Sequence, residues 1–544
     1  MSGTLDCIVV GYNDTPFAKL LERAKLVRDH SGGYLHLKAN SVAFRGERIK
    51  YSDLINTCIS ASTGNESHYH VGRLPSLGAC YLASFLRKRG LRAEVVNFFN
   101  YDKGRLAQLL TESPRSVAIT TTFYFELDPI REIVDFVRHY NSETRIIVGG
   151  PYVFNVCSDY PPAIQDTLFK QAGADIYVFD SQGELTLSRI CNQLRTPKPA
   201  LDTIPNLVCA SDSGAFCRTG REIENNDMDE NAVDWSTFDR DFMRPAVQTR
   251  TARSCAFKCA FCRYPVLAGS LDLTSLDVIE KELDYLHSNG VTHLLFIDDT
   301  FNIPAGRFKE ICRLLIRKKY DFKWFSYFRC ANADDEAFAL MAEAGCTGVF
   351  LGIESGDQAI LKGMNKAATV ERYKYGLRQL NARGIARYAS FIIGFPGETK
   401  ESARNTMAFI QETQPTFYCL ESYFHDKKVP IADKSDVYDI KGQAYSWKHK
   451  TMDWIQAAEL VNEGYRTITS SVILPLYSFD LWSLGYFMSQ GFAIEQLTAF
   501  LKLASKMLVR GLDEATPAYA DLEEQILSVF RAPQPRRASS HVLC

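Results

Sequence analysis

The sequence predicts an α/β protein in which a doubly wound parallel sheet is followed by a partial barrel of six βα units and a helical carboxyl-terminal extension. Two observations predict this fold. Short segments rich in Val and Ile alternate with helical patterns up to about residue 200, and the alternation restarts at residue 246. Such alternation is typical of parallel sheets whose strands are joined by helices. The predicted ranges are a first domain at 1–205 with an insertion at 12–75, a linker at 206–240, a barrel at 241–424, a helical domain at 425–530 and a disordered tail at 531–544.

The composition is that of a globular enzyme. The chain has 544 residues, of which 46% are hydrophobic and 23% charged, and its net charge is −2. This balance gives no basic footprint for nucleic acid or for an anionic membrane, so neither is an expected partner. The first residues, Met1 to Asp6, lack the basic region of a signal peptide. The fifteen cysteines form no disulfide framework, and we therefore expect a cytoplasmic protein.

In the first domain, five short apolar segments bounded by Gly or polar residues are predicted strands: 5–11, 92–98, 116–122, 145–149 and 175–179. Helical patterns separate them, at 76–89, 128–140, 162–172 and 184–194. Doubly wound sheets bind ligands beyond the carboxyl ends of their strands. The loops expected to face a ligand are therefore 11–14, 120–125, 149–152 and 180–184.

The segment between the first predicted strand and the helix at 76–89 is far longer than an ordinary loop between a strand and a helix. We expect residues 12–75 to form either a functional insertion or a lid. A second irregular segment, at 211–239, is rich in polar residues and is interpreted as the boundary between domains.

The second half of the chain has six predicted strands, at 246–250, 291–297, 323–329, 347–353, 387–393 and 416–423, and a helix follows each of the first five. Thr274 and Asp277 resemble a capping box, and an apolar stripe from Leu276 to Leu286 predicts the helix that follows. Pro304 fits the first turn of the next helix. The apolar stretch 470–489 contains a proline and an aspartate, and it is interpreted as a buried helix pair rather than a membrane span.

Three cysteines follow the first predicted barrel strand. Cys255, Cys259 and Cys262 have the spacing C-x3-C-x2-C. Three thiolates on one loop can hold three corners of an iron–sulfur cubane and leave one iron open for chemistry. A structural zinc site normally needs a second pair of ligands, and the chain has no second C-x2-C. A disulfide would leave one of the three thiols unpaired.

The cysteine spacing, with Phe261 just before the last cysteine, resembles the signature of radical S-adenosylmethionine (SAM) enzymes, and residues 70–425 resemble the branch of that family with a cobalamin-binding domain. The resemblance implies that the cysteines bind a 4Fe–4S cluster and that SAM is cleaved to a 5′-deoxyadenosyl radical. It also implies SAM-binding roles for residues of the cysteine loop and of four later strand ends: Phe261, Asp298, Asp299, Arg329, Glu354, Ser355, Gly394 and Glu398. Helix capping, a surface salt bridge and tight turns are the structural alternatives for these positions.

The same resemblance implies a cobalamin site in the first domain. Its expected residues precede the helix at 76–89 or follow the predicted strands: Arg73, Thr120, Thr121, Thr122, Gly149, Gly150, Pro151, Gly183 and Glu184. The chain has no Asp-x-His-x-x-Gly sequence, so we expect no histidine ligand to cobalt from that motif. Arg73 is the candidate for approach to the lower face of the corrinoid.

The resemblance therefore implies a methyltransferase that moves a methyl group from SAM, through methylcobalamin, to an unactivated carbon or phosphorus of a small-molecule or peptide natural product. An external one-electron donor of the flavodoxin or ferredoxin type is the expected partner. Three alternatives stay open: a radical rearrangement or cyclisation without methyl transfer, a methylthiotransferase, and a cobalamin carrier without enzymatic activity. For a methylthiotransferase the second cluster would need Cys7, Cys58 and Cys80, and two of these lie in a predicted strand and a predicted helix.

Overall fold

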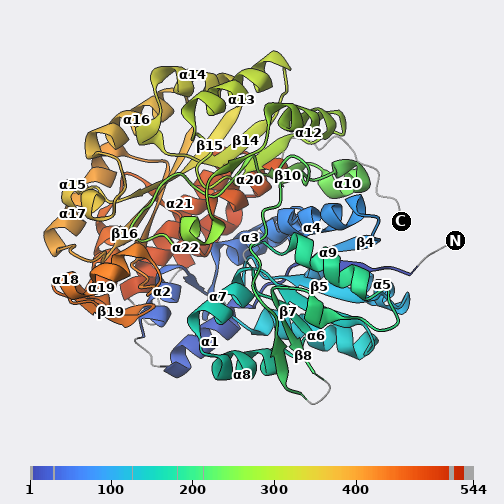
Figure 1. Cartoon of the computed structure of the whole chain (residues 1–544). Helices are drawn as coiled ribbons and strands as arrows, with labels where there is room; N and C mark the ends of the chain where they lie inside the picture. The colour runs from blue at the N-terminus through green and yellow to red at the C-terminus, as the bar shows by residue number, and fades with distance from the viewer. Residues whose placement is uncertain are drawn as a thin grey trace. The chain divides into compact units, whose positions relative to one another are not determined.

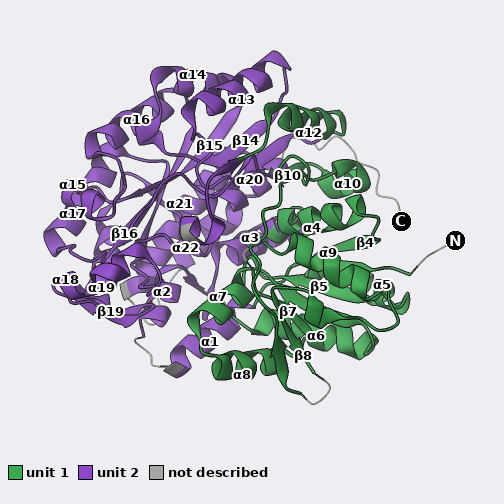
Figure 2. Ribbon diagram, in the orientation of Figure 1, with its two compact units in different colours: residues 1–15, 72–248, 273–290 green, residues 16–71, 249–272, 291–544 purple. Residues whose placement is uncertain are grey.

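The computed structural model describes residues 4–27, 31–124, 126–180, 182–211, 214–513 and 520–531. Apart from Arg531, the predicted disordered tail lies outside these residues, and so does Cys544. The chain forms two compact units (Figures 1 and 2). Unit 1 comprises residues 1–15, 72–248 and 273–290, and unit 2 comprises residues 16–71, 249–272 and 291–544.

Unit 1 is built on a seven-stranded sheet in the order β4-β1-β5-β6-β7-β8-β9. The first five strands in this order pair in parallel, and the last two are antiparallel. The parallel strands follow the flavodoxin-like order, in which the direction of the crossovers reverses between β1 and β5. The predicted doubly wound sheet is confirmed. Its strands are β1 (Cys7–Tyr12), β4 (Ala93–Phe98), β5 (Ser116–Thr120), β6 (Arg145–Gly149), β7 (Ile176–Val178), β8 (Leu207–Ala210) and β9 (Phe216–Arg218).

Helices cover both faces of this sheet because side chains alternate along each strand. Ile8 and Val10 of β1 pack with α5, α6, α7 and α8, whereas Cys7 and Val9 pack with α4 and α9. Both hydrophobic clusters are fully buried, as expected for a parallel sheet. The helices of unit 1 are α4 (Leu77–Lys88), α5 (Phe99–Thr111), α6 (Asp128–Tyr140), α7 (Pro151–Asp159), α8 (Pro162–Ala172), α9 (Glu184–Gln193), α10 (Arg240–Met243) and α12 (Leu276–Ser288).

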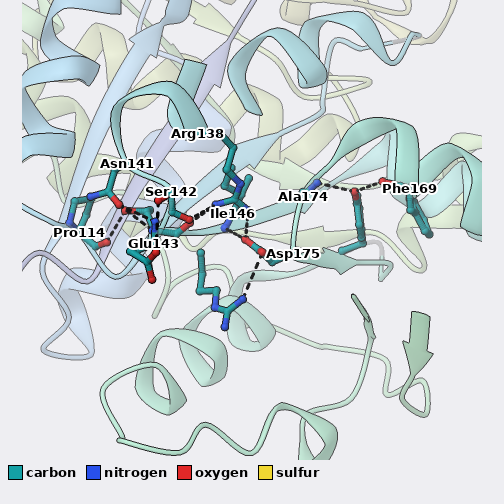
Figure 3. Close-up of polar contacts among 12 residues, drawn as sticks. Pro114, Arg138, Asn141, Ser142, Glu143, Ile146, Phe169, Ala174 and Asp175 are labelled. Atoms are coloured by element: carbon teal, nitrogen blue, oxygen red, sulfur yellow. Dashed lines mark hydrogen bonds and ion pairs between the residues drawn. The ribbon is translucent and has the colours of Figure 1, made fainter. Parts of the chain in front are cut away.

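The amino ends of β6 and β7 are fixed by Asp175, as Figure 3 shows. Its Oδ2 accepts hydrogen bonds from Arg138 Nη2 and from the backbone N–H of Ile146, both at 2.6 Å. The Tyr177 hydroxyl donates to the carbonyl of Phe169 at 2.7 Å. These contacts order the edge of the sheet opposite the predicted ligand-facing loops.

The segment predicted as a linker differs from expectation, because β8 and β9 lie within it and complete the sheet of unit 1. Both are short, and β9 has no fully buried residue, so their apolar signal in the sequence is weak. Helices α5 and α7 were also absent from the predicted elements. The predicted helix starts at residue 76 and residue 184 are confirmed to within one position.

A second seven-stranded sheet has the order β10-β13-β14-β15-β16-β17-β21, and its pairs from β13 onward are parallel. The strands from β13 onward belong to unit 2. The first six strands are those predicted for the partial barrel, and β21 is an addition. The strands are β10 (Ala246–Thr249), β13 (His293–Phe296), β14 (Lys323–Tyr327), β15 (Cys346–Glu354), β16 (Ala386–Ile393), β17 (Phe417–Ser422) and β21 (Val472–Ile473). The helices between them are α11 (Tyr264–Ala268), α13 (Ala305–Arg317), α14 (Asp335–Glu343), α15 (Gln358–Gly363), α16 (Val370–Ala382) and α17 (Lys400–Thr413), and a small ladder pairs β11 (Ala252–Arg253) with β12 (Asp272–Leu273).

Three local predictions need correction. The N-cap of α12 is Ser275, whose side chain accepts from the N–H of Val278, and the predicted capping residue Thr274 is buried before it. Helix α13 begins at Ala305, so Pro304 is its N-cap residue rather than part of its first turn. The stretch 470–489 holds β21 and one helix, not a helix pair, because Pro475 and Asp480 separate the two elements. None of the helices among the described residues combines the length and the apolar character that a membrane crossing requires.

The insertion belongs to unit 2 and not to the sheet that it interrupts in the sequence. It packs against the carboxyl-terminal segment: the N–H of Tyr51 donates to Ser478 Oγ at 2.6 Å, and Arg48 Nη2 donates to the carbonyl of Gly511 at 2.9 Å. The insertion comprises α1 (Phe17–Val27), α2 (Gly32–Ala39), β2 (Val42–Phe44), β3 (Glu47–Ile49) and α3 (Tyr51–Thr63). The carboxyl-terminal segment comprises α18 (Ser435–Tyr438), β18 (Lys441–Gln443), β19 (Ser446–His449), β20 (Met452–Asp453), α19 (Trp454–Thr467), α20 (Leu481–Ser489), α21 (Ile494–Asp513) and α22 (Ala520–Ser528).

Candidate functional site

The loop that carries the three cysteines follows β10 and β11 and is anchored through its backbone. The N–H of Ala260 donates to the carbonyl of Met364, and the N–H of Ile431 donates to the carbonyl of Ala260, both at 2.8 Å. The side chain of Asn365 donates to the carbonyl of Lys258 at 2.7 Å. These three bonds, between segments more than a hundred residues apart, fix the loop at its centre.

Two of the three thiols, Cys255 and Cys259, face polar groups of neighbouring strand ends. Cys255 Sγ lies 3.4 Å from Thr300 Oγ1, and Arg329 Nη1 lies 3.8 Å from Cys259 Sγ. Burial raises the pKa of Cys262 to about 11, and the charges of Cys259 and Cys255 add to the increase. Among the residues that the structure describes, no three His, Cys, Asp or Glu side chains are placed to share one metal ion. The donor set and the guanidinium beside Cys259 fit an anionic thiolate-bound cluster.

Arg329, which follows β14, is 8% exposed and has no carboxylate partner among the described residues. Its guanidinium donates to the carbonyl of Lys366 and to Asn332 Oδ1, and it lies 3.6 Å from the centroid of the Phe257 ring. It is therefore not a surface salt bridge. A buried cation without a counter-charge is unfavourable, which makes this group a candidate for binding an anionic ligand.

The two aspartates that follow β13, Asp298 and Asp299, have different environments. Asp298 is 1% exposed and accepts three hydrogen bonds from Thr251, two from its N–H and one from its hydroxyl, at 2.9–3.1 Å. Burial is the main cause that raises the pKa of Asp298. Asp299 is accessible to solvent although protein surrounds most of its carboxylate, and burial together with the charge of Asp298 raises its pKa to about 6. Asp299 is the member of the pair that can contact a ligand.

The two predicted residues at the end of β15, Glu354 and Ser355, also have different environments. Glu354 has a φ of +71°, which is unusual for a residue other than glycine, and its Oε1 lies 2.9 Å from Lys366 Nζ. A Cβ on Gly352 would lie 2.5 Å from that carboxylate, so the glycine leaves room for it. Ser355 is fully buried, and its hydroxyl lies 3.2 Å from Thr406 Oγ1. The Glu354–Lys366 pair was not predicted from the sequence.

The turn after β16 is closed by its own residues. Gly394 has a φ of +97°, and a Cβ there would lie 2.5 Å from Trp447 Cη2. Its N–H donates to Glu398 Oε2, which places the glutamate inside the turn. Glu398 is completely buried, one of its carboxylate oxygens has no hydrogen-bond partner, and burial raises its pKa to about 8. The protonated side chain that this implies at neutral pH stabilises the turn.

A partly buried pair at the carboxyl end of β17, formed by Glu421 and His36, was not predicted from the sequence. A Cβ on Gly464 of α19 would lie 2.3 Å from Leu420 Cδ1, so the Leu420 side chain faces α19 and Glu421 points to the opposite, inner face of the barrel. Glu421 Oε2 lies 3.5 Å from His36 Nδ1 of the insertion, and its Oε1 has no hydrogen-bond partner within the part of the chain that the structure describes. Burial raises the pKa of Glu421 to about 8 and lowers the pKa of His36 to about 4. Both groups are therefore neutral at pH 7.

In unit 1, the three predicted threonines have different surroundings. Thr120 Oγ1 donates to the carbonyls of Val10 and Gly11 at 3.1 and 2.6 Å, and Thr121 Oγ1 donates to the carbonyl of Gly149 at 2.8 Å. Both hydroxyls hold neighbouring strand ends together. Thr122 is exposed at the switch point of the sheet.

The glycines after β6 and before α9 are also at this edge. Gly150 has a φ of +106°, a Cβ there would lie 2.9 Å from Thr121 Oγ1, and Pro151 begins α7. Gly183 precedes α9, and its N–H donates to Glu184 Oε2 at 2.9 Å. The amino end of α9 is occupied by Glu224, whose carboxylate accepts from the N–H groups of residues 185 and 186 at 2.9 and 2.8 Å. Glu224 lay in the predicted linker and was not a predicted site residue.

Arg73 is exposed and lies 5.0 Å from the centroid of the Tyr101 ring. Its segment is held by Asn97, whose amide donates to the carbonyls of residues 72 and 74 at 3.1 and 3.0 Å. Exposed rings accompany it at this edge, since Tyr101 and Phe123 are 42% and 52% exposed. The carboxyl edge of the unit 1 sheet therefore combines a cation, exposed aromatic rings and, at Gly150, a backbone that a ligand can approach closely.

Comparison with known proteins agrees with this arrangement. Residues 249–410 match the model of the Radical SAM superfamily. An uncharacterised methyltransferase of Pyrococcus horikoshii is 26% identical over 353 residues, covering 62% of this chain and 73% of that protein. The anaerobic magnesium-protoporphyrin IX monomethyl ester cyclase of Rubrivivax gelatinosus is 22% identical over 440 residues, covering 75% of this chain and 76% of that protein.

Among solved structures, the radical SAM methyltransferase TsrM from Kitasatospora setae, with cobalamin and a [4Fe-4S] cluster bound, matches with a TM-score of 0.54 at 18% identity. The match covers 67% of this chain and 73% of that one. Residues 249–410 are thus a radical SAM domain. The match shows a shared fold, which in this chain comprises a doubly wound sheet and a partial barrel.

Proposed function

We propose that the protein is a cobalamin-dependent radical SAM methyltransferase acting on a carbon or phosphorus centre of a small-molecule or peptide substrate. In this reaction the methyl group leaves the sulfur of one SAM, which becomes S-adenosylhomocysteine, and replaces a hydrogen of the substrate. A second SAM takes up that hydrogen as it is cleaved to 5′-deoxyadenosine and methionine, with electrons from the external donor. The observation that carries the proposal is the anchored cysteine loop beside Arg329, a buried guanidinium without a carboxylate partner among the described residues. When bound, a 4Fe–4S cluster would supply the electron for SAM cleavage and cobalamin would carry the methyl group.

Cys255, Cys259 and Cys262 would hold the cluster. The SAM carboxylate would meet Arg329, because a carboxylate gives this buried guanidinium the counter-charge that it lacks. The methionyl amino group would meet Asp299, whose carboxylate is accessible, while Asp298 holds the strand end in place through Thr251. The ribose hydroxyls would meet Glu354, and the turn that begins at Gly394 would lie beside the adenine.

The carboxyl edge of the unit 1 sheet is the proposed cobalamin site. Thr122 is the exposed threonine at the switch point. Gly150 has a positive φ that favours glycine, and because it has no side chain, the space beside Thr121 stays open. Arg73 and the exposed ring of Tyr101 offer a cation and an apolar surface to a large planar ligand. Glu184 is a weaker candidate, because its carboxylate already accepts from the N–H of Gly183 and from Asn226.

We place the substrate at the inner face of the barrel near Glu421. Its free carboxyl oxygen is buried without a partner, and a hydrogen-bond donor or acceptor of the substrate would complete its coordination. His36 comes from the insertion, which gives this segment a role in substrate binding. An external one-electron donor would complete the reaction.

Anaerobic reconstitution with iron, sulfide and cobalamin tests the proposal. We expect optical and EPR signals of a 4Fe–4S cluster, and with SAM and a reductant we expect formation of S-adenosylhomocysteine together with 5′-deoxyadenosine. Cys259→Ala should lose the cluster signal and keep cobalamin binding, whereas Cys330→Ala, which changes a buried cysteine outside the loop, should keep both. Zinc in place of iron in oxygen-protected protein would contradict the proposal.

A cyclisation or rearrangement without methyl transfer is a second candidate, because one relative is a cyclase similar over 75% of this chain. The products separate the two reactions. A cyclisation would yield 5′-deoxyadenosine without S-adenosylhomocysteine. A methylthiotransferase receives little support, because Cys7 and Cys80 are buried in β1 and α4.

A further inference from the structure

A cavity of about 540 Å³ lies in unit 2 at the amino ends of β16, β17 and β21, the edge of the sheet opposite Glu354 and Glu421. Its volume is within the range of small-molecule sites, about 300–1,000 Å³. Helix α16, the end of α17 and helix α21 supply the rest of its lining. None of these lining residues belongs to the candidate active site.

The cavity is basic. Four cationic side chains line it, from Lys374, Arg378, Arg387 and Lys502, and Glu412 is the one carboxylate among its lining residues. Glu412 Oε2 lies 2.8 Å from Lys374 Nζ, so this carboxylate is already paired. Among the described residues, the other three positive charges have no counter-charge inside the cavity.

Arg387 is the central feature, because it is buried. It is 9% exposed, and its guanidinium bonds to one neutral group, the hydroxyl of Thr416, at 3.1 and 3.4 Å. Burial alone lowers its pKa, with no opposing effect of a carboxylate. The hydroxyl of Ser471, also in the lining, is buried without a hydrogen-bond partner. Among the described residues, a buried guanidinium at this cavity thus lacks a counter-charge and a buried hydroxyl lacks a hydrogen-bond partner.

We propose that this cavity binds a small polyanion that carries phosphate groups and is about the size of a nucleotide. A phosphate offers several acceptor oxygens to the planar fork of Arg387, to the hydroxyl of Ser471 and to the exposed cations Arg378 and Lys502. A single carboxylate would satisfy one guanidinium and leave the other two charges unpaired. The site is separate from the chemistry at the carboxyl edge, so its ligand is a regulator or a stabilising ligand and not the methyl acceptor.

Calorimetric titration of the cluster-reconstituted full chain with inorganic pyrophosphate tests this inference. We expect saturable binding to one site, and a thermal midpoint that increases with pyrophosphate but not with sodium chloride of equal ionic strength. Sulfate at equal ionic strength controls for the general stabilisation that such anions give. Arg387→Gln should weaken pyrophosphate binding by at least about tenfold, the effect of losing one charge-assisted contact.

Lys502 and Lys506 provide a matched pair on α21. Both are exposed, they are one helical turn apart, and only Lys502 lines the cavity. Lys502→Gln should weaken binding several-fold and Lys506→Gln should leave it unchanged, and both variants should fold because the side chains are exposed. If both variants weaken pyrophosphate binding equally, the affinity depends only on the overall surface charge and not on the cavity. That result, or the absence of saturable binding at millimolar pyrophosphate, would overturn the proposal, and neither depends on the methyltransferase activity.

Discussion

Replacing Glu354 by glutamine should destabilise unit 2 and impair cluster loading. Glu354 Oε1 lies 2.9 Å from Lys366 Nζ, and the two side chains are 11% and 6% exposed. Lys366 belongs to the segment that positions the cysteine loop, because its carbonyl accepts from Arg329 and its neighbour Met364 accepts from the N–H of Ala260. Glu354 is at the end of β15, and its negative charge holds the segment around Lys366 in place. The substitution removes this charge.

Removing one partner of a buried ion pair leaves an uncompensated buried charge, at a cost of about 3–5 kcal/mol. The glutamine oxygen can still accept a hydrogen bond from Lys366, so we expect the lower end of this range. A unit of this size shifts its unfolding midpoint by about 2 °C for each kcal/mol, which gives a decrease of about 6 °C.

Differential scanning calorimetry of the full chain measures the midpoint, and iron per chain after reconstitution measures cluster loading. The control is Glu463→Gln, which removes the carboxylate of the exposed pair with Arg404 and should shift the midpoint by less than about 2 °C. The double variant Glu354→Gln, Lys366→Met should recover part of the loss because it removes the unpaired cation. If Glu354→Gln has the same unfolding midpoint as the wild type and binds as much iron, the Glu354–Lys366 pair does not position the cysteine loop, and the prediction is refuted.

Three further predictions follow from single side chains. Gly394→Ala should cost about 1–3 kcal/mol more than Gly384→Ala in unfolding experiments, since both have a positive φ but only the first would place a Cβ 2.5 Å from Trp447; equal losses would contradict this. Arg329→Lys should weaken SAM binding to the reconstituted enzyme by about ten- to a hundredfold in equilibrium dialysis, and unchanged affinity would exclude the carboxylate contact. Glu421 has a folded pKa of about 8, above its usual value, so its contribution to stability is present at low pH and is lost as the pH rises through 8. Glu421→Gln should therefore gain stability relative to the wild type between pH 5 and pH 8 in denaturant titrations, and parallel pH profiles would refute the burial of a neutral carboxyl group.

The sequence predicted the strands that are buried on both faces. Residues 7–10 and 146–148 are continuous apolar runs, and they lie in β1 and β6. Strand β21 could not be predicted, because its two residues acquire their partners only when the carboxyl-terminal segment returns to β17. Strand β9, with three residues and no buried side chain, gives no periodic signal either.

Those residues of the candidate site that belong to a local sequence pattern could be predicted. The spacing of the cysteines is local, and Arg329 stands at the end of a recognisable strand. The partners that complete the site are distant in the sequence: Lys366 follows Glu354 by twelve residues, and His36 meets Glu421 from the other end of the chain. Burial gives these pairs their properties, and burial is a result of the tertiary fold that no local pattern encodes.

Adjacent residues at the strand ends explain why the predicted positions divide into two groups. Successive side chains point in opposite directions, so one member of each pair turns into the protein and the next turns to the open edge. Asp298 bonds to Thr251 while Asp299 is accessible, and Thr121 bonds to Gly149 while Thr122 is exposed. A strand end that presents a ligand contact therefore also needs a polar neighbour that fixes the backbone, because the last peptide groups of the strand have left the sheet. Polar pairs at these positions are consequently a sign of a ligand site in which only one of the two residues touches the ligand.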